Sequence, residues 1–165
     1  CYEEDADKLY VCEPTSGDCD TAAEWRDTSG AGGGTSAVIG FSGAGAIIPK
    51  ATTLFLGLGP GTVGTTEINF GFYVTQAGTL SDLYTYISAN ASDQAANTVF
   101  VRKNGVATSI TTSYGAGETG LKSDTTNTET VAATDYVTVQ VVNNDSGGGG
   151  AADIVIEAVS FLLGP

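Results

Sequence analysis

Residues 98–114 read TVFVRKNGVATSITTSY, and this stretch decides how the rest of the chain is interpreted. Val99 and Val101 alternate with other residues before Asn104-Gly105, and alternation resumes in the residues that follow the turn. A period of two is typical of a β-strand with one buried face. Asn-Gly is the preferred two-residue hairpin turn because both residues tolerate positive φ. The stretch therefore predicts two antiparallel strands joined by a type I′ turn.

Further strands are expected on both sides of this hairpin, and no segment repeats with the period of a helix. The expected strands are 52–58, 67–74, 80–88, 137–141 and 154–163. In the second of these, Ile68, Phe70, Phe72 and Val74 are expected to share one face. About eight short strands rich in Val, Ile, Thr and aromatic residues are typical of all-β antiparallel domains. The sequence predicts a jelly-roll β-sandwich.

Charge and composition restrict the partners of the chain. Its 165 residues suit a single main domain, and 19 acidic against 6 basic residues give a net charge of −13. Such a charge repels phosphate, so nucleic acid and anionic membranes are poor partners. No apolar run is long enough to span a membrane. The chain begins at Cys1 and has no Met, which indicates a fragment, a processed product or, alternatively, a mature lipoprotein.

The three cysteines all lie within the first 19 residues. Cys12 and Cys19 flank a short polar turn, which predicts a disulfide and an oxidising compartment; a Cys1–Cys12 pair is the alternative. The predicted organisation is a small Cys/Trp hairpin module at 1–27, a glycine-rich linker at 28–50 and the jelly-roll sandwich at 51–165. The glycine run at 30–34 is the basis for the linker.

Motifs that suggest enzyme chemistry fail on physical grounds. Residues 59–64 match the glycine pattern of a dinucleotide loop, but a strand is expected after them where a phosphate-binding helix is required. Thr65 replaces the lysine of a phosphate-binding P-loop. Ser42 lies in an incomplete nucleophile elbow, and the chain has no His to act as its base. We therefore expect no catalytic residues, no cofactor and no enzyme activity.

Acidic pairs and glycosylation sequons are interpreted conservatively. Asp5 with Asp7, and Asp18 with Asp20, offer oxygen atoms to calcium but complete no known calcium loop, so solvated acidic loops are the favoured interpretation and no metal site is predicted. Sequons begin at Asn90 and at Asn144. Chance occurrence explains them in a chain this rich in Asn, Ser and Thr.

Three stretches carry a resemblance to a known family, namely 98–106, 123–139 and 152–157. They resemble the C1q/TNF-like jelly-roll domains of bacterial and phage surface proteins, as in the C-terminal domains of spore-surface collagen-like glycoproteins. Residues 9–12 with Trp25 resemble a short module that precedes such domains. The resemblance implies a non-enzymatic trimer at the end of a fibre or on a particle surface, and therefore an extracellular, cell-surface or virion-surface location.

The final predicted strand gives a second reason to expect self-association. Its alternation places apolar side chains on both faces, and one sandwich covers only one face of a strand. The predicted interface residues are Val155, Val159, Phe161 and Leu163. The alternative is that residues 38–41 of the same chain cover the strand. The competing function is a carbohydrate- or receptor-binding module whose ligand platform is Tyr84, Tyr86 and Tyr114.

Overall fold

The computed structural model describes residues 2–5, 8–12, 25–27, 36–59, 61–92, 96–145 and 152–165. The chain divides into two units, Cys1–Thr35 and Ser36–Pro165. In the first unit, β1 (Tyr2–Asp5), β2 (Lys8–Cys12) and β3 (Trp25–Asp27) form an antiparallel sheet in the order β1-β2-β3. The predicted Cys12–Cys19 disulfide stays a prediction because Cys1 and Cys19 lie outside the described residues, as do Asp7, Asp18 and Asp20.

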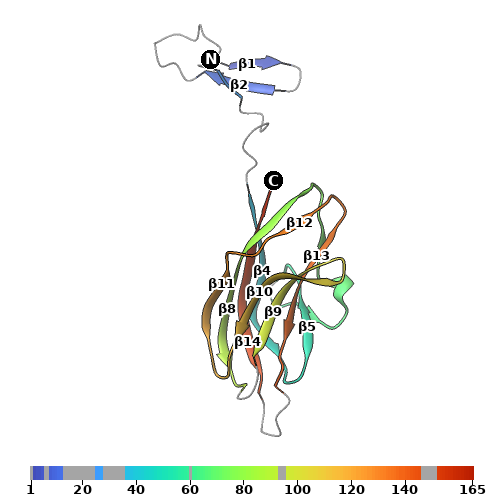
Figure 1. The fold of residues 1–165 in the computed structure, drawn as a ribbon, viewed down its shortest axis with the longest axis vertical. Coiled ribbons are helices and arrows are strands. Elements are labelled where there is room, and N and C mark those ends of the chain that lie inside the picture. Colours follow the sequence, from blue (N-terminus) through green and yellow to red (C-terminus); the bar gives the residue numbers. More distant parts are fainter. Residues whose placement is uncertain are drawn as a thin grey trace. The chain divides into compact units, whose positions relative to one another are not determined.

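The second unit is a sandwich of two antiparallel sheets, which confirms the predicted all-β sandwich (Figure 1). Sheet I has the order β11-β8-β14-β4, and β12 pairs with β8. Its strands are β4 (Ala37–Ile48), β8 (Gly78–Asn90), β11 (Gly120–Asp124), β12 (Glu129–Val131) and β14 (Ile154–Gly164). Sheet II has the order β10-β9-β13-β5-β6, and β7 pairs with β13. Its strands are β5 (Thr53–Leu56), β6 (Val63–Gly64), β7 (Phe72–Tyr73), β9 (Asn97–Lys103), β10 (Val106–Tyr114) and β13 (Tyr136–Val142).

The core lies between the two sheets and is built from every second residue of the long strands. Sheet I contributes residues such as Leu83, Ile87 and Ile154, and sheet II contributes residues such as Val101 and Val139. All five are completely buried. Removing apolar area from water stabilises a fold by roughly 25 cal/mol per Å². The strict alternation in β9 and β13 is therefore the signal by which the sequence specifies the sandwich.

The hairpin predicted at residues 98–114 is confirmed. Asn104 and Gly105 have φ of 51° and 81°, as a type I′ turn requires. Lys103 pairs with Val106 directly beside the turn. The Asn104 side chain also receives a hydrogen bond from the backbone N–H of Tyr136, with a distance of 2.8 Å. The turn is thus anchored to the neighbouring strand β13.

The predicted strand at 67–74 is wrong for most of its length. Glu67–Asn69 forms the short 3-10 helix η2, strand pairing is confined to β7, and Ile68 is 59% exposed. Glycines explain the difference. A Cβ on Gly64 would lie 2.4 Å from the Phe70 ring, so Phe70 folds back onto the chain and the alternation is interrupted. Residues 61–74, called the strap below, thereby cross the outer side of sheet II.

The predicted linker at 28–50 is also wrong beyond residue 36, because residues 37–48 form β4 of sheet I. Gly43, which lies within the predicted linker, serves close packing. A Cβ on Gly43 would lie 2.1 Å from the carbonyl oxygen of Ile156, at the point where the register between β4 and β14 shifts. Residues 38–41 therefore lie beside β14 as a neighbouring strand and do not cover its face.

Strand β14 does not have two fully apolar faces. A bulge between Ile156 and Ala158 changes the alternation, so that Ile154, Ile156, Val159 and Phe161 all face the core. The outward residues are Val155, Ala158, Ser160 and Leu162. A bulge adds one residue to a strand and thereby reverses which side chains point inward. The prediction of two apolar faces is therefore wrong, because the sequence pattern gives no sign of this bulge.

Candidate interaction surfaces

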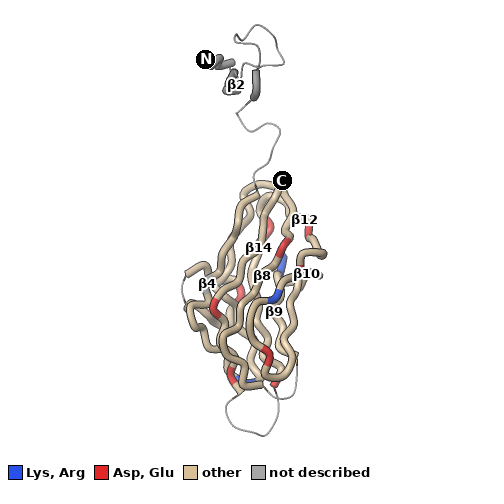
Figure 2. The backbone as a smooth tube through the Cα atoms, turned by 90° about the vertical axis from the view of Figure 1, so that its left-hand side faces the viewer, with Lys and Arg blue, Asp and Glu red and all other residues tan. Residues whose placement is uncertain are grey.

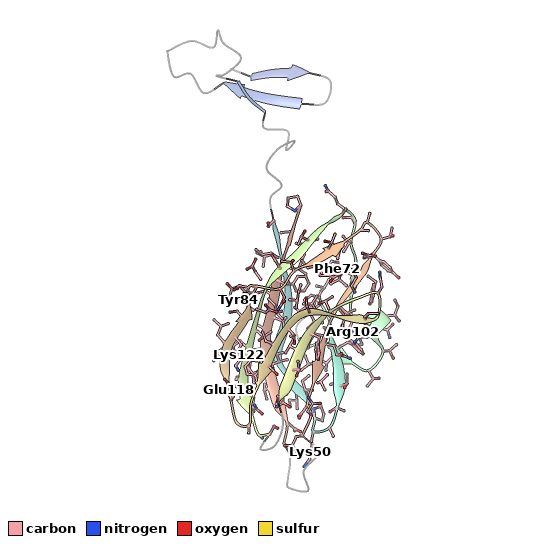
Figure 3. All side chains as sticks on the ribbon, in the orientation of Figure 1. Lys50, Phe72, Tyr84, Arg102, Glu118 and Lys122 are labelled. Carbon is pink, nitrogen blue, oxygen red and sulfur yellow. The ribbon has the colours of Figure 1, made fainter. Side chains whose placement is uncertain are left out.

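Large apolar side chains that remain exposed gather on two surfaces among the described residues. The first, the tyrosine face, is the outer side of sheet I, and its members are Val38, Ile47, Tyr84, Tyr86 and Leu121. The second, the strap side, lies on and around the strap, and its members are Leu58, Ile68 and Tyr73. Val106, which is also exposed, lies beside the Asn104-Gly105 turn at the start of β10. Figure 3 shows Tyr84 and Arg102, a residue of β9 below the strap, on opposite sides of the sandwich.

The tyrosine face combines two aromatic rings with a floor of small residues. Tyr84 and Tyr86 are 42% and 43% exposed. Across the sheet, Tyr84 lies opposite Ser160 and Tyr86 lies opposite Ala158, while Gly40 of β4 lies opposite Ser160. Small side chains beside the rings leave a groove of about 370 Å³. Its lining residues are Val38, Asp82, Tyr84, Ser160, Phe161 and Leu162.

A bulge in β8 places one carboxylate in this groove. Asp82 has a φ of 53°, and the register between β8 and β14 shifts at this point. Leu80 and Leu83 are both completely buried, so the two residues between them are directed away from the core. The hydroxyl of Ser81 donates a hydrogen bond to Asp82 Oδ2 at 2.8 Å. Bulges often re-aim a side chain beside a binding site, and Asp82 fits that use.

Charge is sparse on the tyrosine face although the chain carries −13. Asp82 is the one residue with a charged side chain at neutral pH among the six that line the groove. Figure 2 shows long uncharged stretches along β4, β8 and β14. Nearer the start of β14, Glu157 accepts a hydrogen bond from the hydroxyl of Ser88 at 2.7 Å. The part of the tyrosine face around the groove is thus suited to contacts that do not depend on charge pairing.

Tyr114 does not belong to the predicted tyrosine platform. Its side chain is completely buried, and its hydroxyl donates to the carbonyl oxygen of Thr85 at 2.8 Å. It also shares a hydrogen bond of 2.7 Å with the hydroxyl of Thr85. Burial raises the pKa of the Tyr114 hydroxyl, although its hydrogen bonds act in the opposite direction. Tyr114 is a core residue that links the two sheets, and the bulge in β10 after Ala107 concealed this from the sequence pattern.

The four predicted interface residues differ in exposure and in the direction of their side chains. Val159 and Phe161 are each 1% exposed, and Phe161 stacks on Phe41 at a centroid distance of 5.8 Å. Both are therefore covered within one chain and are not available to a neighbouring copy. Val155 is half-buried and directed outward, whereas Leu163 is half-buried and packs against the core.

An ion pair fixes the strap to sheet II. Glu67 accepts hydrogen bonds from Arg102 Nε at 2.9 Å and Nη2 at 3.3 Å, and another from the Thr138 hydroxyl at 2.7 Å. Arg102 also donates to Gln140 Oε1 at 3.0 Å. Burial raises the pKa of the Glu67 carboxyl, but hydrogen bonds from Arg102 and Thr138 outweigh it, so the pKa lies below its usual value. Glu67 is therefore a structural anion at neutral pH.

Besides this ion pair, the strap carries an exposed aromatic ring, that of Tyr73, and lines a groove. Tyr73 is 61% exposed and contacts the ring of Tyr136 at a centroid distance of 5.0 Å. The hydroxyl of Tyr136 accepts a hydrogen bond from the Gly71 N–H at 2.8 Å and donates one to the Glu67 carbonyl oxygen at 3.0 Å. The groove has a volume of about 310 Å³. Its lining residues are Gly57, Leu58, Gly59, Thr62, Asn69, Phe70 and Gly71.

The structure explains several motifs without assigning them chemistry. In the glycine pattern at 59–64, Val63–Gly64 form β6, so no helix begins there to bind phosphate. The Asn90 amide donates to the carbonyl oxygens of Gly115 and Glu118, both at 2.9 Å, and is therefore engaged in structure. Ser42 lies in β4, and its side chain is not described. Within the described ranges, no three potential metal ligands gather, and none of the helices has the length and hydropathy to cross a membrane.

The sequence matches no protein-family profile and no curated protein. Among solved structures, the chain is similar to a GH26-CBM35 β-(1,4)-mannanase of Podospora anserina. The TM-score is 0.41 at 17% identity over 76% of this chain, and the match spans 27% of the mannanase chain. The described chain therefore corresponds to about a quarter of that enzyme's length. The similarity is too remote to carry an argument about function.

Proposed function

We propose that this chain is a non-enzymatic structural protein of a cell or virion surface, and that it self-associates through the tyrosine face. The observation that carries the proposal is an open sheet face with exposed Tyr84, Tyr86 and Leu121 and little charge, in a chain of net charge −13. Exposed apolar patches of this kind are uncommon on monomers. Two copies also repel each other least where their surfaces are uncharged.

The proposed assembly is a trimer of jelly-roll subunits. The distribution of strands supports a jelly-roll topology, because the chain passes back and forth between the sheets: β8, β11 and β14 lie in sheet I, and β9, β10 and β13 lie in sheet II. The threefold symmetry comes from the resemblance of residues 98–106 and 152–157 to C1q/TNF-like domains. The extracellular location rests on the same resemblance and on the cysteine-containing first unit.

Light scattering of the full chain at low and moderate salt tests this proposal. We expect a particle of about three chain masses that becomes more stable with salt, because salt screens the repulsion between acidic copies. Leu121→Asp should dissociate it. Val106→Asp is the matched control, because Val106 is 68% exposed at the start of β10 in sheet II and Leu121 is 67% exposed on the tyrosine face. A monomer of 16.6 kDa at both salt concentrations would contradict the proposal.

Carbohydrate binding on the tyrosine face is the second candidate function. The groove beside Tyr84 favours it, because an aromatic ring, the Asp82 carboxylate and the Ser160 hydroxyl line one concave surface. Aromatic rings offer an apolar face to a ligand, while carboxylates and hydroxyls form hydrogen bonds with it. A glycan array with the wild-type chain and Tyr84→Ala separates the candidates. Specific binding that Tyr84→Ala abolishes in a monomeric chain would favour this second function over self-association.

A further inference from the structure

We propose that the strap side is a separate binding site for an uncharged carbohydrate chain, with the ring of Tyr73 as its platform and the adjacent groove as its extension. The site is independent of the self-association proposed above, because it lies on the outer side of the other sheet. No residue of the strap side was selected as a binding residue from the sequence.

The platform is rigid before any ligand arrives. The Tyr73 ring rests against Tyr136, with an interplanar angle of 55°. Tyr136 is only 8% exposed and is held by two hydrogen bonds, one with Gly71 and one with Glu67. A ring already fixed in place loses little conformational freedom on binding, so more of its contact energy contributes to affinity. Tyr73 nevertheless remains 61% exposed, so much of its surface is free for a ligand.

Hydrogen-bonding groups lie beside the platform. The backbone N–H of Val74, the next residue, donates to the carbonyl oxygen of Asp135 at 2.8 Å. The Asp135 carboxylate accepts hydrogen bonds from the Asn104 amide at 2.7 Å and from the Ala132 N–H at 2.8 Å, and a carboxylate can accept more than two. Thr134 in the same turn has a φ of 78°, an unusual conformation for a β-branched residue. Such strained positions are concentrated at functional sites.

The groove continues the site with uncharged chemistry. Gly71 lines the groove and also contacts Tyr136, which joins the groove to the platform. The Phe70 ring and the half-exposed Leu58 provide apolar walls, and Asn69 and Thr62 provide an amide and a hydroxyl. No ionisable side chain is among the seven residues that line it. A sugar chain, with apolar ring faces and hydroxyl edges, matches this mixture.

Charge further restricts the ligand. Glu67 and Arg102 below the groove neutralise each other. The chain as a whole carries −13, so uronic-acid and sulfated polymers are repelled. The ligand class is therefore a neutral oligosaccharide.

Binding measurements on the full chain test this inference. An array of neutral oligomers of glucose, mannose, xylose and N-acetylglucosamine identifies the probe, and calorimetry with that oligomer measures its affinity. We expect Tyr73→Ala to weaken binding about tenfold, equivalent to about 1.4 kcal/mol, and Leu58→Ser to weaken it less. Oligogalacturonate should not bind. Thermal melting checks that the variants remain folded, which the exposure of Tyr73 favours.

Tyr84→Ala is the matched control, since it removes the same side chain from the other face. Unchanged affinity in this variant, with loss in Tyr73→Ala, supports the strap site. The reverse pattern, or no binding by any neutral oligomer on the array, overturns it. Light scattering distinguishes the two proposals: Tyr73→Ala should assemble like the wild-type chain, and a failure of self-association would leave the carbohydrate measurement unaffected.

Discussion

The outer faces of the two sheets are built from similar strands, but the face of sheet II is covered by the strap and the face of sheet I is exposed. On sheet II, the outward residues Tyr136 and Thr138 are 8% and 0% exposed because the strap covers them. On sheet I, the outward residues Tyr84 and Tyr86 remain more than 40% exposed, and no described segment crosses them. Alternation in a strand thus decides which side chains leave the core. What those side chains then meet depends on the connection that crosses the sheet.

The covered face is stabilised by a polar network, whereas the open face has almost none. The strap is attached by Glu67, which joins Arg102 and Thr138. The open face has two isolated pairs of a carboxylate with a hydroxyl, Asp82 with Ser81 and Glu157 with Ser88. A face closed within one chain needs satisfied polar groups, because burial of an unpaired charge is costly. A face that is buried only when another copy binds is exposed to water in the free chain. Tyrosine suits such a face, because its ring is apolar and its hydroxyl forms hydrogen bonds.

The largest expected difference in the free energy of unfolding is between substitutions on the inward and the outward side of β14. Phe161→Ala should lower the free energy of unfolding by about 3–5 kcal/mol, since Phe161 is a fully buried ring. Leu162→Ala, the next residue along, should cost less than about 1.5 kcal/mol in the monomer because Leu162 lies outside the core. Urea unfolding measures both. Equal losses would show that the bulge at residues 156–158 is misplaced.

Removal of the strap's anchor should have the next largest effect. Arg102→Ala leaves the Glu67 carboxylate without its cation, and we expect a loss of about 2–3 kcal/mol in the free energy of unfolding. The matched control is Lys122→Ala at the more exposed pair with Glu118, which should cost much less. Thermal melting with intrinsic fluorescence measures both variants. A loss in Arg102→Ala no larger than in the control would mean that the strap is not held by this pair.

Acid should weaken the covered face before the open face. The folded-state pKa of Glu67 lies below its ordinary value of 4.5, so its contribution to stability is present above that pH. The contribution is lost as pH falls through the lowered folded-state pKa. The Asp124 carboxyl, in β11 of sheet I, contributes separately to the overall pH slope and does not belong to the covered face: burial raises its pKa, but hydrogen bonds from Thr111, Thr126 and Asn127 lower it by more. Glu67→Gln should flatten the decline in melting temperature between about pH 5 and pH 3; an unchanged slope would contradict this assignment.

The smallest effect on stability is expected on the open face. Leu121→Ser should change the free energy of unfolding by less than about 0.5 kcal/mol in the monomer, because the side chain is 67% exposed. The same substitution should weaken self-association. Chemical unfolding at low concentration, compared with light scattering at high concentration, separates the two effects. A large loss of monomer stability would indicate that Leu121 packs within its own chain.

The sequence by itself determined the all-β class, the hairpin at Asn104-Gly105 and most core positions of β9 and β13. Those features depend on alternation and on turn chemistry, which are local properties of the chain. It also singled out Tyr84 and Tyr86, which the structure places on one open face.

Tertiary structure decided the features that depend on contacts between distant segments. The bulges at Asp82 and at residues 156–158 reversed the direction of side chains, and both lie where the register between β8 and β14 shifts. The sequence placed Gly43 in a linker and Gly64 in a loop pattern, yet each glycine is needed because Ile156 or Phe70 lies where a Cβ would be. The exposure of Tyr73 follows from the strap's path, which the Glu67–Arg102 pair fixes across 35 residues of sequence. A pattern read along the chain contains no information about the atoms that approach from elsewhere in the fold.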